Sequence, residues 1–140
     1  MTTLNELYNL AENESITVVA FSLQKREALS MMDSEGQCYV AIDPHKIASC
    51  AEEKSKLAHE LGHCMTGAFY NVYSPCDSRQ RHENRADRWA IKKLIPKDEL
   101  ERAVANGYTE LWELADLFNV TEDIMRKAVS LYRYGNLCAV

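Results

Sequence analysis

The chain has 140 residues, with 21 acidic and 16 basic side chains and a formal net charge of −5 at pH 7. This length predicts one domain, residues 1–140, that is large enough to bury a hydrophobic core. The acidic balance argues against extensive binding to nucleic acid. No apolar run approaches the roughly 18 residues of a membrane span, and we expect no signal peptide. The sequence therefore predicts a cytoplasmic protein without membrane contact.

The first predicted elements are a short helix and a strand. Thr3 and Glu6 have the spacing of a capping box, in which two side chains cap the first turn of a helix. Residues Ile16–Phe21 are rich in β-branched side chains, which predicts a strand.

A β-hairpin is predicted next. Ala28–Met32 and Gln37–Ile42 have strand composition and flank a short polar segment that contains Gly36. Glycine adopts the positive φ angle that such hairpin turns need. We therefore expect a small antiparallel sheet in this part of the chain.

The following predicted element is a helix over residues 49–67. Ser49 and Glu52 form a second capping box, and Gly67 is a typical helix end. Gly62 lies inside the helix at a cost of about 1 kcal/mol relative to alanine, so we expect a neighbouring backbone to approach closely there. One side of the helix is apolar at intervals of three or four residues: Leu57, Leu61, Cys64, Met65 and Ala68.

This helix carries the motif H-E-L-G-H at residues 59–63. His59 and His63 are four positions apart, so they share one helical face, with Cβ atoms about 5–6 Å apart. Two imidazoles placed in this way can bind one zinc ion, and Glu60 points toward the same opening. There Glu60 can act as general base on the water that attacks a substrate.

A catalytic zinc ion usually has three protein ligands, and the next predicted helix supplies a candidate for the third. This helix starts near residue 77 and ends before Pro96. Glu83 and Asp87 are four positions apart and share a face, and we take Glu83 as the third ligand. Asp87 is expected to accept a hydrogen bond from the far nitrogen of a ligand histidine, His59 in preference to His63.

Two residues of this helix have ordinary alternatives. For Asp87 the alternative is a salt bridge to Arg85 or Arg88 on the same helix. His82 is adjacent to Glu83 but points about 100° away around the helix, so we interpret it as a surface residue.

At these residues the chain resembles the ImmA/IrrE metallopeptidases. Members of that family show H-E-x-x-H, then E-x-x-A-(D/N)-x-F-A, then a hydrophobic stretch that ends in proline. Here these motifs span residues 59–96, and Trp89 replaces the usual phenylalanine. The E-x-x-x-D spacing is also similar to that of the gluzincin peptidases.

The resemblance implies a zincin-like α+β fold, in which a small antiparallel sheet packs on a mainly helical core. It also implies that His59, His63 and Glu83 bind Zn²⁺ and that Glu60 is the general base. The implied activity is that of a zinc endopeptidase that cleaves or otherwise inactivates a helix-turn-helix repressor of a prophage or other mobile element. The alternative is a catalytically silent zinc-binding regulator that acts by binding protein or DNA.

Two segments are expected to border the active cleft. An exposed edge strand commonly binds an extended peptide, and we expect Gln37–Ile42 to be that strand. In the connection over residues 69–77, Tyr70 or Tyr73 can supply a hydroxyl that stabilises an oxyanion. The alternative, which we favour for each ring taken alone, is that these tyrosines simply pack.

Three short helices are predicted after the proline, over Asp98–Ala105, Thr109–Phe118 and Glu122–Tyr134. The last two resemble a helix-turn-helix, so residues 109–135 are expected to form a helix-turn-helix-like tail. A DNA-reading helix is normally basic and exposed, whereas Glu122–Tyr134 has mixed charge. We therefore favour packing on the core, or docking of the partner repressor, over direct DNA binding.

Five cysteines occur without any C-x-x-C pair: Cys38, Cys50, Cys64, Cys76 and Cys138. This odd number and spacing do not predict a disulfide framework. We expect reduced cysteines, as is usual in the cytoplasm.

Overall fold

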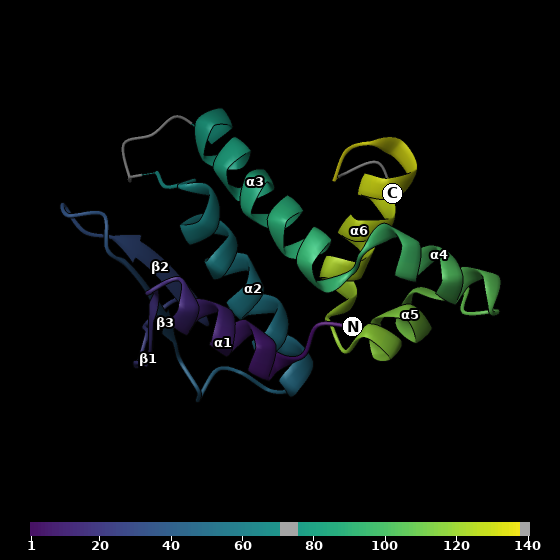
Figure 1. Cartoon of the computed structure of the whole chain (residues 1–140), viewed down its shortest axis with the longest axis horizontal. Coiled ribbons are helices and arrows are strands. Elements are labelled where there is room, and N and C mark those ends of the chain that lie inside the picture. The colour runs from purple at the N-terminus through teal and green to yellow at the C-terminus, as the bar shows by residue number, and fades with distance from the viewer. Residues whose placement is uncertain (71–75, 138–140) are drawn as a thin grey trace.

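Helices dominate the part of the chain that the computed structural model describes, which is residues 1–70 and 76–137. The elements are α1 (Leu4–Asn13), β1 (Thr17–Ala20), β2 (Ala28–Met32), β3 (Cys38–Ile42), α2 (Cys50–Thr66), α3 (Cys76–Leu94), α4 (Lys97–Ala105), α5 (Leu111–Phe118) and α6 (Glu122–Tyr134). The predicted α+β class is confirmed. Figure 1 shows the sheet and α4–α6 at opposite ends, with α2 and α3 side by side between them. Within the described ranges, no helix is both long and apolar enough to cross a membrane.

The sheet has the strand order β1-β3-β2 and is mixed. β2 and β3 pair antiparallel with Ala28 opposite Ile42, so the predicted hairpin is confirmed, and Gly36 has a φ of 84°. β1 pairs with β3 in parallel, with Thr17 opposite Tyr39. The expectation of an antiparallel sheet therefore holds for the hairpin and is wrong for the pairing of β1.

β3 is the central strand, so the expectation that Gln37–Ile42 is an exposed edge strand is wrong. Cys38, Val40 and Ile42 alternate along β3 and are all buried, whereas β1 has no buried residue. Removing such an apolar row from water is favourable, and the middle of the sheet covers it best. The edge strands of the sheet are β1 and β2.

The hydrophobic core lies between the sheet and the helices. Leu7 of α1, and Leu57 and Leu61 of α2, are fully buried and belong to one cluster with Val40 of β3. This packing holds α2, the helix that carries the motif, against the sheet.

α2 begins and ends where its sequence predicts. The Ser49 hydroxyl oxygen accepts a hydrogen bond from the backbone N–H of Glu52 at 3.1 Å, and Gly67 ends the helix with a φ of 67°. A Cβ atom on Gly62 would lie 2.5 Å from the backbone oxygen of Ala86. The predicted close approach is therefore confirmed, and the backbone that approaches is that of α3.

The turn between α5 and α6 lies against α2. α5 and α6 pack against each other, and α6 also packs against α3. The buried Lys54 of α2 donates a hydrogen bond to the backbone oxygen of Phe118 at 2.7 Å, and Ser55 Oγ accepts one from the backbone N–H of Thr121 at 3.1 Å. These two hydrogen bonds hold the turn between α5 and α6 against α2, the helix that carries the H-E-L-G-H motif.

Cys38 of β3 and Cys64 of α2 form a disulfide, with Cα atoms 6.0 Å apart. The expectation of reduced cysteines is therefore wrong for this pair. The two residues are 26 positions apart in the sequence, and only the packing of α2 on the sheet brings them together. Cys50 and Cys76 are free and exposed, and Cys138 lies outside the described residues.

Candidate metal centre

His59 and His63 lie one turn apart on α2, with ring centroids 4.9 Å apart. His63 is buried, His59 is partly exposed, and their neighbour Glu60 is buried as well. One ligand atom from each of these three side chains lies within 4.8 Å of the other two. The three side chains together can therefore hold a metal ion.

Glu83 of α3 reaches both histidines. Its Oε2 lies 2.7 Å from Nε2 of His59, and its Oε1 lies 3.4 Å from Nε2 of His63. α3 can approach this closely because Gly62 places no side chain between the two helices. Imidazole nitrogens and a carboxylate thus converge on one point, and these are donors that zinc takes in catalytic sites.

The other ring nitrogens of both histidines also have partners. Nδ1 of His59 lies 2.7 Å from Oδ1 of Asp87, and Nδ1 of His63 is hydrogen-bonded to the backbone oxygen of Ala68. A carbonyl or an ionised carboxylate only accepts hydrogen bonds, so each Nδ1 carries a proton. In a neutral ring the lone pair is then on Nε2, the atom that faces Glu83.

Asp87 has a second partner, Lys127 of α6. Lys127 Nζ lies 3.0 Å from Oδ2 of Asp87, so His59 and Lys127 each satisfy one oxygen of this buried carboxylate. A salt bridge from Asp87 to Arg85 or Arg88 is not found among the residues that the structure describes. The chain of side chains Lys127–Asp87–His59 therefore connects α6, α3 and α2.

These hydrogen bonds set the charges of the cluster. Burial raises the pKa of Glu83, but hydrogen bonds from both histidines and Tyr70 hold it well below its ordinary value. Burial likewise raises the pKa of Asp87, but the hydrogen bond and charge of His59 lower it. For His59 itself, burial lowers the pKa, while hydrogen bonds to the two carboxylates raise it to about 10. The cluster therefore favours positive charge, whether a proton on His59 or a metal ion.

Glu60 provides a direct test of whether a metal ion fits. Its Oε2 is buried and has no hydrogen-bond partner within residues 1–70 and 76–137. Buried polar atoms nearly always have partners, so this oxygen marks a place for a group that the chain does not supply. Beside His59, His63 and Glu83, that place fits a metal ion and its water.

A cavity of about 450 Å³ opens beside the cluster. Leu29 and Ser30 of β2 line it, together with groups from α2, the segment that follows α2, and α3. Arg26 and Arg79 bring two positive charges to its wall. The strand that borders the site is therefore β2, an edge strand, and not β3.

Tyr70 lies in this cavity, and its hydroxyl donates a hydrogen bond to Oε1 of Glu83 at 2.6 Å. The ring stacks on His82 with centroids 6.2 Å apart, so His82 is partly buried and not simply a surface residue. The hydrogen bond to Glu83 and burial raise the pKa of the Tyr70 hydroxyl, while the nearby positive charge of Arg26 acts in the opposite direction. The Tyr70 ring is therefore packed, and its hydroxyl also contacts the site. Tyr73 lies outside the described residues.

Sequence reasoning missed Lys127 as a neighbour of the site. Helical spacing relates residues of one helix only, and Lys127 is 40 positions from Asp87. The sequence does place Lys127 beside the apolar face of α6. It is next to Ala128 and three positions after Ile124, and both of these residues are buried. A cation at that position needs a partner from another element.

A helix that carries two histidines and a glutamate beside a cavity, with a second glutamate added by a neighbouring helix, is the arrangement of a metal-dependent peptidase. The chain belongs to the Peptidase_M78 family, whose model, described as the IrrE N-terminal-like domain, matches residues 11–130. The resemblance drawn from the motifs is thereby confirmed. The match extends through most of α6 and so includes most of the helical tail. Among curated proteins, none matches the chain.

Proposed function

We propose that the protein is a zinc-dependent endopeptidase. His59, His63 and Glu83 hold the zinc ion, Glu60 is the general base, and Asp87 orients His59. The observation that carries this proposal is the convergence of two Nε2 atoms and the Glu83 carboxylate beside the buried, unpartnered oxygen of Glu60. Membership of a peptidase family supports it independently.

Each side chain has its own task in peptide hydrolysis. Zinc bound at such a site polarises a carbonyl and lowers the pKa of a water molecule to about 7. Glu60 accepts the proton of the attacking water at its free oxygen and passes it to the amine that leaves as the peptide bond breaks. Asp87 keeps the proton of His59 on Nδ1, so that Nε2 remains free as a ligand. Tyr70 places a hydroxyl in the cavity, where it can stabilise the oxyanion.

The edge of β2 offers a binding place for an extended substrate. Leu29 and Ser30 line the cavity, and in the described part of the chain β2 pairs with β3 alone. The main-chain groups along its other edge are therefore available, and a substrate segment pairs there as an additional strand. Such pairing depends little on side chains, so we expect selectivity to come from docking elsewhere.

We further propose that the substrate is a helix-turn-helix repressor of a prophage or other mobile element, which is cleaved or otherwise inactivated in the cytoplasm. The resemblance to the ImmA/IrrE metallopeptidases supports this target. The net charge of −5 also supports it, because the DNA-reading face of a repressor is basic and opposite charges favour encounter.

The test compares wild type with Glu60→Gln on a purified helix-turn-helix repressor. An amide cannot accept the proton of water, so cleavage should slow by at least about 100-fold, while the zinc content should stay the same. Glu53→Gln on the same helix is the matched control, because its amide oxygen can still accept the hydrogen bond from Tyr8. Fragment masses and zinc content are measured. Undiminished cleavage by Glu60→Gln would remove Glu60 from the mechanism.

The second candidate is a catalytically silent zinc-binding regulator. The observation that favours it is the contact of Lys127 with Asp87. Through this contact, a partner that binds the tail can be coupled to the metal centre without any catalytic step. This candidate predicts that wild type and Glu60→Gln release the repressor from its operator equally well and that neither produces fragments.

A further inference from the structure

A second cavity, of about 640 Å³, lies between α4, α5 and α6, and we call it the tail cavity. It shares no lining residue with the cavity at the candidate metal centre, which is the smaller of the two. Its volume falls within the range of about 300–1,000 Å³ that is usual for small-molecule sites. Neither the proposed peptidase chemistry nor the edge of β2 makes use of it.

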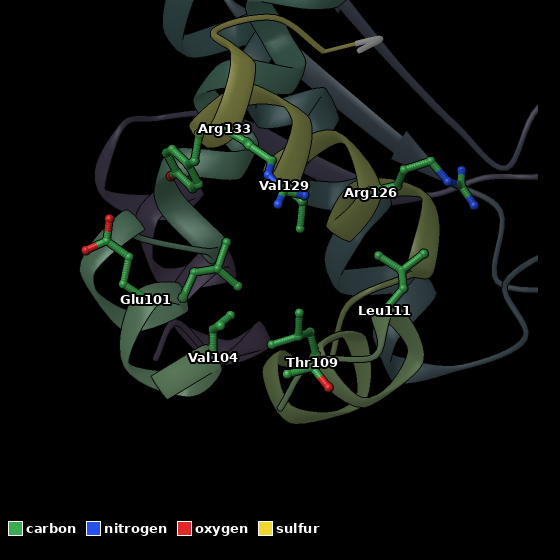
Figure 2. A pocket seen from close by; sticks show the side chains of 10 residues that line it. Glu101, Val104, Thr109, Leu111, Arg126, Val129 and Arg133 are labelled. Carbon is green, nitrogen blue, oxygen red and sulfur yellow. The ribbon is translucent and has the colours of Figure 1, made fainter. Parts of the chain in front are cut away.

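The walls of the tail cavity are mostly apolar. They are formed by Leu100 and Val104 of α4, Leu111 and Leu114 of α5, and Val129 and Tyr132 of α6. In Figure 2, Val104 and Val129 extend into the hollow from opposite helices, while Glu101 and Arg126 extend away from it. An apolar side chain such as Val104, with 46% of its surface exposed, gains free energy when a ligand covers it.

The base and one wall are held in place by the fold. Leu100 and Leu114 are buried in the hydrophobic core. The hydroxyl of Tyr132 donates a hydrogen bond to the backbone oxygen of Ile95 at 2.7 Å, which fixes the ring. The cavity therefore exists before any ligand binds, and little ordering is needed when one does.

One positive charge at the rim is available to a ligand. Arg126 pairs with Asp123 at 3.5 Å and points away from the hollow. Arg133 lies 5.7 Å from the ring centroid of its neighbour Tyr134. Among the described residues, no carboxylate lies within ion-pair distance of Arg133.

We propose that the tail cavity binds a small amphipathic anion, such as a medium-chain or aromatic carboxylic acid. The apolar body contacts Val104, Val129 and the ring of Tyr132, and the acid group pairs with Arg133. Walls from three helices and a single guanidinium suit a small molecule with one charge. α6 also carries Lys127, so the ligand and the candidate metal centre share one helix.

The test uses two dyes that differ by one sulfonate. 8-Anilinonaphthalene-1-sulfonate should bind the full chain saturably at one site, and uncharged N-phenyl-1-naphthylamine should bind more weakly. Arg133→Gln should lower the affinity for the anionic dye roughly fivefold, which is the scale of one partly exposed ion pair. The affinity for the neutral dye should stay the same. Arg102→Gln on α4 is the matched control, because Arg102 is exposed and does not line the cavity. Decanoate should displace the anionic dye, and decanol should do so far less.

A filling variant locates the site. Val104→Trp should abolish binding of both dyes. If circular dichroism shows that this variant does not fold, Leu111→Trp on the facing helix takes its place. Equal loss of both dyes in Arg133→Gln, or none, would overturn the proposal. NMR shift changes confined to three exposed residues in or next to the sheet, Val19, Phe21 and Met31, would also overturn it. A dimer in sedimentation that Val104→Trp disperses would assign the hollow to a second copy of the chain and likewise overturn it.

Discussion

The cavity at the candidate metal centre and the tail cavity differ in how much charge lines them. Glu60, His63, Glu83 and two arginines lie in the wall of the first, beside apolar residues such as Leu29 and Phe69, whereas the tail cavity is largely apolar. A charge in a partly buried place must be held by partners, so the first cavity depends on contacts among α2, α3 and α6. An apolar wall needs no such partners. We therefore expect coupled, large effects from changes at the metal centre and local effects from changes in the tail.

The largest effect is expected from Glu83→Ala. Two histidines alone cannot complete a catalytic zinc site, so the variant should lose most of its zinc while the tail cavity still binds the anionic dye. Zinc content after dialysis and dye titration measure the two effects. Glu101→Ala at the rim of the tail cavity is the control and should keep its zinc. Full zinc content in Glu83→Ala together with loss in Asp87→Ala would reverse the roles given to these two carboxylates.

Gly62→Ala should destabilise the protein without removing any ligand. The new Cβ would lie 2.5 Å from the backbone oxygen of Ala86, and such overpacking costs about 1–3 kcal/mol, offset by about 1 kcal/mol of helix propensity. Because the contact is with backbone, which cannot shift easily, the upper part of the overpacking range applies, and the free energy of unfolding in urea should fall by about 1–2 kcal/mol. Adding Ala86→Gly should not restore it, because the contact is with backbone. Wild-type stability in Gly62→Ala would show that α2 and α3 are less closely packed.

Lys127→Met should weaken zinc binding by less than the roughly 10–100-fold expected for a direct partner of a ligand histidine, and a few-fold loss is the expected size. The reason is that Asp87 keeps its hydrogen bond with His59 but loses its cation. Lys127→Arg should restore most of the affinity. Arg126→Met, one position away and paired with Asp123, is the control. If Lys127→Met and Arg126→Met behave alike, the contact of α6 with Asp87 has no effect on the metal.

The smallest effect concerns salt. Cleavage of a basic repressor should slow modestly, by less than the loss expected for Lys127→Met, as salt rises, since exposed charges are screened beyond about 10 Å at 0.1 M. The rate of fragment formation at low and high salt measures this, with casein as the unrelated substrate. Efficient and salt-insensitive digestion of casein would instead point to a housekeeping peptidase and would remove the electrostatic basis of selectivity.

Helix positions and their ends followed from local patterns. Thr3 and Ser49 cap the helices that their spacing predicts, and Gly67 ends its helix with a positive φ. The hairpin around Gly36 also formed as predicted. These features depend on residues a few positions apart, whose relative placement is set by the geometry of one turn.

Pairings across the chain did not follow from such patterns. β3 became the central strand, β1 joined it in parallel, and Cys38 met Cys64. Alternation along a strand tells which residues share a face, but it does not tell which strands are neighbours. Cysteine count and spacing led to the wrong expectation of reduced thiols for Cys38 and Cys64, because the distance between β3 and α2 is a property of the packed core.

The sequence alone determined the two histidines on one helical face, the glutamate between them, and the pair Glu83 and Asp87 on the next helix. Helical periodicity fixes these relations before any tertiary contact forms. Only the tertiary structure decided that Glu83 meets both Nε2 atoms, that β2 borders the cavity, and that Lys127 reaches Asp87. These are contacts between elements far apart in the chain, and they follow from which surfaces the core buries against one another.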